Sequence, residues 1–253
     1  MLSNLPLYLL SLPVVLLALS VHEAAHGYVA YKLGDPTAYS MGRLTLNPLK
    51  HLDPIGFLCM VLFHIGWARP VPINPRYFKN PRRGMAISAA AGPISNLLLA
   101  LIFAILLRVE VLLVDIFMQE DVSALFSYLV YNPNVEIAMG IKMASVLAYI
   151  LYMGIVLNTS LAIFNMIPVP PFDGSRIVHV FLPAKWYFAI MRYERYIMIG
   201  FLVFLWVTPM TWLSDATWWL SSGFRWVVGL TGDNAATIEF SAMISYVQKA
   251  LTL

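Results

Sequence analysis

The sequence predicts an all-α polytopic membrane protein: a bundle of four to six transmembrane helices, with a small membrane-associated β or loop element between the first two spans. Of its 253 residues, 60% are hydrophobic and only 11% are charged, whereas a soluble domain carries about a quarter charged residues. Several apolar runs also reach the roughly 20 residues that cross a bilayer as a helix. The net charge of +3 is too small to indicate nucleic acid as a partner.

Four segments reach spanning length. They are Leu5–Tyr31, Met85–Leu107, Ile141–Asn165 and Tyr196–Leu213. A fifth segment, Trp218–Leu230, is shorter and is interrupted by Gly223 and Arg225. It could cross the bilayer at a tilt or lie at the interface, where tryptophan is enriched.

Two further apolar segments are too short or too amphipathic to span. Pro54–Ala68 is expected to dip into the bilayer or to pack on it. Ile238–Leu251 has one apolar helical face, which is typical of an amphipathic surface helix. The predicted division is a transmembrane core over residues 1–213. Residues 214–253 would form the short fifth span or interfacial segment and the amphipathic C-terminal helix.

Charges between the spans predict the orientation of the chain. Residues 34–83 contain seven Lys and Arg residues and two Asp residues, whereas residues 108–140 are acidic. By the positive-inside rule the first of these segments is cytoplasmic and the N-terminus lies outside. We therefore expect a multi-pass protein of the cell membrane, bacterial or archaeal, with the polar residues of its first span toward the cytoplasm.

The first predicted span contains three ionisable residues, in the stretch LALSVHEAAHGYVAY. His22 and His26 are four residues apart and therefore project from one face of a helix. Two neutral imidazoles at this spacing can bind one zinc ion, and Glu23 can act as general base toward a zinc-bound water. Ionisable residues within a span cost about 2.5–3.5 kcal/mol each, which favours a functional site over a structural histidine pair.

A catalytic zinc ion needs a third protein ligand and leaves its fourth position to water. The candidate follows the third span, in IFNMIPVPPFDGSR. Its prolines cannot continue the helix, and non-helical backbone at membrane depth is tolerated only where it is buried or lines a cavity. Asp173 comes next, on the side that His22 and His26 also face. A simple helix-ending turn is the alternative, and the predicted topology favours the ligand.

These two motifs resemble those of the site-2 protease family of intramembrane zinc metalloproteases, in the minimal, core-only type without a PDZ or CBS domain. The family pattern is HExxH on one span and N-x-x-P-x-P-x-x-D-G at a later one. The matching residues are His22, Glu23, His26, Asn165, Pro168, Pro170, Asp173 and Gly174. The resemblance implies one Zn²⁺ per chain, with His22, His26 and Asp173 as its ligands. It also implies that Glu23 is the catalytic base.

Two intramembrane asparagines are candidates for substrate binding or for a contact with the oxyanion. Asn96 lies in AAAGPISN, which resembles the G-x-x-x-N element of the family's middle span, and Asn165 begins the second motif. An amide at such a place can stabilise developing negative charge. Each amide could instead bridge helices or satisfy a carbonyl, and the sequence leaves both roles open.

The stretch RPVPINP, residues 69–75, alternates prolines with Val71 and Ile73. This pattern suits an edge strand, which could receive an extended substrate by strand addition. A structured loop that only covers the site is the alternative.

The leading interpretation is an intramembrane zinc endopeptidase that hydrolyses peptide bonds in or near the transmembrane segments of membrane proteins, through a zinc-activated water and a Glu base. Its partners would be these substrates and the lipid bilayer. A metal or ion transporter that uses intramembrane His and Asp residues is the alternative, although the inverted repeats of many transporters are not evident. A silent binding protein is a third class, which the complete set of ligands and base argues against.

Overall fold

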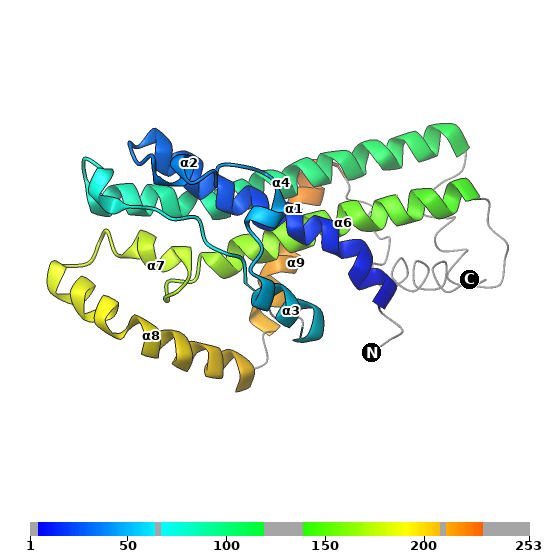
Figure 1. The fold of residues 1–253 in the computed structure, drawn as a ribbon. Coiled ribbons are helices and arrows are strands. Elements are labelled where there is room, and N and C mark those ends of the chain that lie inside the picture. The colour runs from blue at the N-terminus through cyan, green and yellow to red at the C-terminus, as the bar shows by residue number, and fades with distance from the viewer. Residues whose placement is uncertain (1–4, 64–66, 119–138, 208–210, 230–253) are drawn as a thin grey trace. The chain divides into compact units, whose positions relative to one another are not determined.

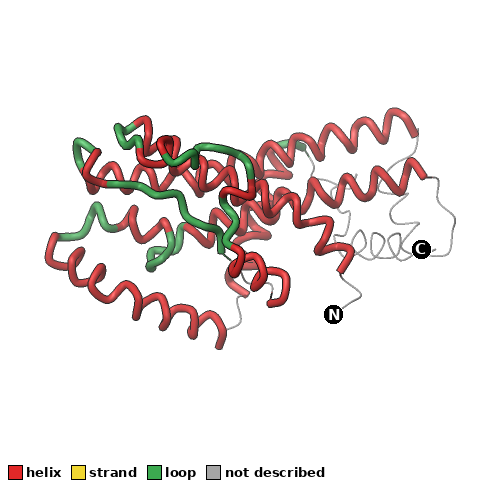
Figure 2. The backbone as a smooth tube through the Cα atoms, in the orientation of Figure 1, coloured by secondary structure: helices red, strands yellow, loops and turns green. Residues whose placement is uncertain are grey.

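The computed structural model describes residues 5–63, 67–118, 139–207 and 211–229 (Figure 1). Within these ranges the chain is mostly helical and contains no strand (Figure 2). The predicted all-α fold class is therefore confirmed. The predicted amphipathic helix over Ile238–Leu251 lies outside the described residues. The proposed division at residue 213 stays a prediction.

Among the described residues, three helices are long and apolar enough to cross a membrane. They are α1 (Leu5–Lys32), α4 (Pro81–Met118) and α6 (Met139–Asn165). They correspond to the first three predicted spans. The fourth predicted span, Tyr196–Leu213, begins inside α8 (Ala184–Val207), which is not one of the three, and it continues into residues outside the described part.

Shorter helices occupy the connections. Between α1 and α4 lie α2 (Thr37–Ser40), η2 (Pro48–Lys50), α3 (Pro54–Phe63) and η3 (Pro75–Tyr77). After α6 come α7 (Asp173–Val178), α8 and α9 (Thr211–Val227). The apolar segment predicted to dip into or pack on the bilayer is thus α3, and the predicted fifth segment overlaps α9.

The chain divides into two compact units, with the boundaries inside helices. The first unit contains Met1–Val15, Leu98–Thr159 and Thr217–Leu253. Its apolar core comes from α1, α4 and α6 and comprises Val14, Phe103, Ala104, Leu107, Val111, Ala148, Tyr149, Leu151 and Ile155. Helices α4 and α6 approach closely where Gly154 faces Phe103, because a Cβ at Gly154 would lie 2.4 Å from the Phe103 ring. Small residues permit such close packing of membrane helices.

The second unit contains Leu16–Leu97 and Ser160–Ala216, and it includes every residue of the candidate site. One buried side chain organises its connection between α1 and α4. Asp35 is fully buried after α1, where its carboxylate accepts hydrogen bonds from the backbone N–H of Thr37, at 3.0 Å, and of Asn74, at 2.6 Å. Asp35 thereby ties the turn after α1 to an extended segment 39 residues later.

That extended segment, residues 69–74, is called the strap below. The strap forms no strand, and the only β-pairing among the described residues is the isolated bridge between Leu52 and Ala68. Of the two structures that the sequence left open for this segment, the edge strand is therefore not formed, and the segment is a structured loop. Pro70 and Pro72 have no N–H to give to a ladder. Several other backbone groups of the strap bind side chains instead: the carbonyls of Arg69 and Pro70 and the N–H groups of Val71 and Asn74.

Candidate metal centre

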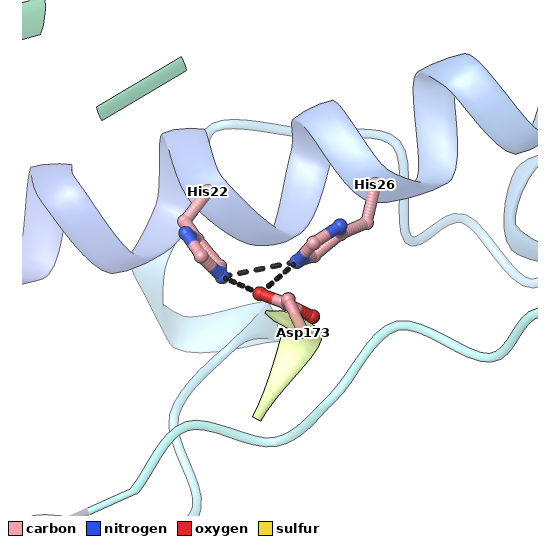
Figure 3. A group of neighbouring side chains, drawn as sticks. All are labelled: His22, His26 and Asp173. Atoms are coloured by element: carbon pink, nitrogen blue, oxygen red, sulfur yellow. Dashed lines mark hydrogen bonds and ion pairs between the residues drawn. The ribbon is translucent and has the colours of Figure 1, made fainter. Parts of the chain in front are cut away.

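Two of the predicted ligands come from one face of α1. This face is buried over successive turns at Ala18, His22, His26 and Ala30, because residues four apart lie above one another on a helix. Both imidazoles point toward Asp173 at the start of α7 (Figure 3). The Nε2 atoms of His22 and His26 are 3.0 Å apart, and Asp173 Oδ2 lies 3.1 Å from the first and 3.3 Å from the second.

The loop after α6 delivers Asp173 to the histidines. Helix α6 ends at Asn165, and a proline-rich stretch connects it to α7. At Gly174 the loop packs on its own beginning, since a Cβ there would lie 2.2 Å from the carbonyl oxygen of Met166. The Phe172 ring packs edge-on against Phe164 of α6, with 4.5 Å between ring centroids. These contacts, made by the residues on either side of Asp173, hold the backbone that carries its carboxylate.

Helix α4 determines which nitrogen of each imidazole faces the cluster. His26 Nδ1 donates to the backbone carbonyl of Ser88 over 2.7 Å, and His22 Nδ1 donates to Asn96 Oδ1 over 2.6 Å. The amide of Asn96 is held in this orientation because its Nδ2 donates to the carbonyl of Ala18. With Nδ1 as the donor in both rings, the two Nε2 atoms are left as the ligand atoms.

The three ligand atoms fit a tetrahedral zinc ion. Ligands at about 2.1 Å from such an ion lie roughly 3.4 Å from one another, close to the 3.0–3.3 Å observed for His22, His26 and Asp173. Three protein ligands with a fourth position open are typical of catalytic rather than structural zinc. Two imidazole lone pairs facing each other at this distance require a cation or a proton between them.

The ionisation of Asp173 suits a role as zinc ligand. Burial raises the pKa of Asp173, but the contacts with His22 and His26 outweigh burial and bring the pKa down to about 2. The side chain is therefore a carboxylate at neutral pH, the form that binds metal.

Glu23 lies beside the ligands in sequence but faces the strap. Its Oε2 accepts a hydrogen bond from the backbone N–H of Val71 over 2.7 Å. The strap is held in turn by Arg43, which donates from Nη2 to the carbonyl oxygens of Arg69 at 2.8 Å and Pro70 at 3.3 Å. Burial and the nearby charge of Arg69 lower the pKa of Arg43, while Glu23 raises it. A second carboxylate is thus fixed next to the ligand cluster.

Asn165, the other candidate amide, has a local partner, as does His51, a histidine in the connection between α1 and α4. Asn165 Nδ2 donates to the carbonyl of Leu161 one turn earlier in α6. His51 is buried and donates from Nε2 to the carbonyl of Thr45, which supports a structural role. His64 lies outside the described residues. Two further residues, Arg43 and Ser88, carry no signal in the sequence. Arg43 binds backbone groups, and Ser88 binds His26 through its own backbone carbonyl, which does not depend on the type of side chain.

The fold and the site define a class: a helical membrane protein with a buried His–His–Asp centre beside a second carboxylate is a membrane metallohydrolase. The chain belongs to Peptidase family M50, whose sequence profile matches residues 11–207. The resemblance to site-2 proteases, the enzyme class of zinc metalloprotease and the Zn²⁺ cofactor are thereby confirmed.

Similar proteins carry matching names. "Putative zinc metalloprotease YwhC" of Bacillus subtilis (strain 168) is 40% identical over 207 residues, which cover 81% of this chain and 84% of that protein. "Putative zinc metalloprotease MJ0611" of Methanocaldococcus jannaschii is 28% identical over 200 residues, covering 78% of this chain and 81% of that protein. No solved structure is a significant match.

Proposed function

We propose that this metalloprotease is an intramembrane endopeptidase, which cleaves peptide bonds in or near the transmembrane segments of other membrane proteins. The observation that carries the proposal is the convergence of His22, His26 and Asp173 at 3.0–3.3 Å. Two of these three residues project from the buried face of α1, a helix long and apolar enough to span a bilayer. Ligands inside a span favour substrates that also lie in the membrane.

Zinc bound by these residues supplies a Lewis acid that polarises the scissile carbonyl and activates water. Glu23 is the proposed general base. One of its oxygens, Oε2, is occupied by Val71 N–H, so Oε1 is left to take a proton from the attacking water. As the carbon–nitrogen bond breaks, Glu23 returns this proton to the leaving amine nitrogen. The net reaction adds one water across one peptide bond.

An extended substrate fits beside the strap. Within a β-type conformation, Val71 and Ile73 direct their backbone groups to the same side, and Val71 N–H points to Glu23. The N–H and C=O of Ile73 make no hydrogen bond to other described residues. They could therefore pair with an unwound substrate segment. Since residues 34–83 are rich in Lys and Arg, we place this reaction toward the cytoplasmic side of the cell membrane.

The test uses purified protein in liposomes with tagged single-span substrates. Wild type is expected to release a cleaved fragment, whereas Glu23→Gln retains zinc but loses at least a hundredfold in rate. His22→Ala is expected to lose both zinc and cleavage. Zinc flux into the same liposomes tests the alternative of a metal transporter. The proposal would be contradicted if Glu23→Gln transported zinc at the wild-type rate and neither protein cleaved the substrates.

A further inference from the structure

Three residues of α4 form one face against the metal centre. Ser88, Gly92 and Asn96 are spaced four apart, so they lie above one another on the helix, and all three are buried. Ser88 and Asn96 are completely inaccessible to solvent. This face meets the two imidazoles that project from α1.

The two ends of this face each bind one imidazole. The Ser88 carbonyl accepts from His26 Nδ1 and the Asn96 Oδ1 accepts from His22 Nδ1, at 2.7 and 2.6 Å. Asn96 also donates through Nδ2 to the carbonyl of Ala18, one turn before His22 in α1. An amide whose two ends are committed in this way has little freedom to turn toward a substrate.

The middle of the face is a glycine for a steric reason. A Cβ at Gly92 would lie 2.4 Å from His26 Nε2 and 2.6 Å from His22 Cε1. The backbone of α4 thus approaches both rings directly. The groups that a Cβ would strike are the ends of side chains, which can rotate. A side chain at position 92 would therefore leave the helices in place and move the rings away from their common point.

We propose that the face Ser88–Gly92–Asn96 positions both imidazoles for metal binding, and that Asn96 is a positioning residue for His22 rather than a substrate-binding residue. The inference rests on the proposed ligand set and goes beyond it, because it gives Asn96 a role toward the imidazole of His22 in place of the substrate or oxyanion contact that the sequence left open. Outer contacts of this kind orient ligating histidines, and their loss weakens metal binding by about 10- to 100-fold.

The experiment measures zinc affinity by chelator competition in the purified full chain, independently of cleavage. Asn96→Leu has similar volume but no acceptor, and we expect its zinc Kd to rise about 10- to 100-fold. Asn96→Asp keeps an acceptor for His22 Nδ1 but loses the donor to the Ala18 carbonyl, so its zinc Kd is expected to lie between those of wild type and Asn96→Leu. Asn165→Leu is the matched control, because the Asn165 amide donates to Leu161, and its zinc Kd should not change.

Gly92→Ala tests the steric half of the inference. Its zinc Kd is expected to rise, and its cobalt-substituted visible spectrum to differ from wild type, while the thermal unfolding temperature changes little. Gly140→Ala is the control, since a Cβ at Gly140 in α6 meets no atom within 4 Å. Normal zinc affinity in Asn96→Leu would overturn the positioning role. Zinc retained by His22→Ala would instead overturn the proposed ligand set, so the two failures are distinguishable.

Discussion

The backbone N–H of Val71 donates to Glu23 Oε2 over 2.7 Å. The proposed base is therefore oriented by a segment 48 residues later in the chain. That segment is itself fixed, by Arg43 at its beginning and by Asp35 at its end. Catalysis should accordingly depend on residues that touch neither the metal nor the substrate.

Loss of the Arg43 guanidinium should slow cleavage without removing zinc. Arg43→Gln loses the hydrogen bonds to the carbonyls of Arg69 and Pro70, and hydrogen bonds from a charged donor contribute about 1.5–3 kcal/mol. Glu23 is then less firmly oriented, and we expect most of this free energy to be lost from the stabilisation of the transition state. The kcat therefore falls roughly 10- to 100-fold. Cleavage rates and zinc content are measured on one preparation. Arg76→Gln, at an exposed position beside the strap, should cleave normally; equal rates for both variants would contradict the prediction.

Gly174→Ala should abolish the metal centre. Its Cβ would lie 2.2 Å from the Met166 carbonyl oxygen and 2.4 Å from the Met166 carbonyl carbon. These are backbone atoms at the end of α6, so the loop that carries Asp173 must move. Zinc content of the purified variant measures the effect. Gly200→Ala, where a Cβ has open space, should keep its zinc, and a zinc-replete Gly174→Ala would show that the loop can adapt.

Asp35→Ala should destabilise the second unit. The buried carboxylate accepts from Thr37 N, Thr37 Oγ1 and Asn74 N, and each buried donor left unsatisfied costs about 1–3 kcal/mol. We expect the free energy of unfolding to fall by about 3 kcal/mol or more, measured by denaturant titration in detergent micelles. The comparison variant is Asp215→Ala, whose residue is exposed and whose stability should match wild type.

Acidification should weaken the fold through His179. Burial lowers the pKa of this largely buried histidine, Arg176 lowers it further, and Glu194 raises it. Because the unfolded chain then binds the proton more tightly, stability is complete above the ordinary pKa of about 6.5 and falls as pH drops below it. Thermal unfolding at pH 7.5 and 5.5 is the measurement. In His179→Gln the difference between the two pH values should shrink; an unchanged difference would exclude His179 as its source.

The grouping of His22, His26 and Asp173 could be predicted because its signals are local. The four-residue spacing of His22 and His26 fixes a common helix face, and the prolines before Asp173 end the preceding helix. The sequence could not decide between an edge strand and a loop for the strap, because its alternating pattern is shared by edge strands and by extended segments bound to side chains. Asp35 and Arg43 bind backbone groups more than 20 residues away, and such pairings depend on tertiary packing that no local pattern reveals.

The distance in sequence between the two parts of the centre has a consequence for biosynthesis. His22 and Asp173 are 151 positions apart, so α1, α4 and α6 are all synthesised before the last ligand exists. A nascent chain that contains only its first helices carries the proposed base and both imidazoles but no complete donor set. A centre with three protein ligands therefore cannot form until the loop after α6 has been made.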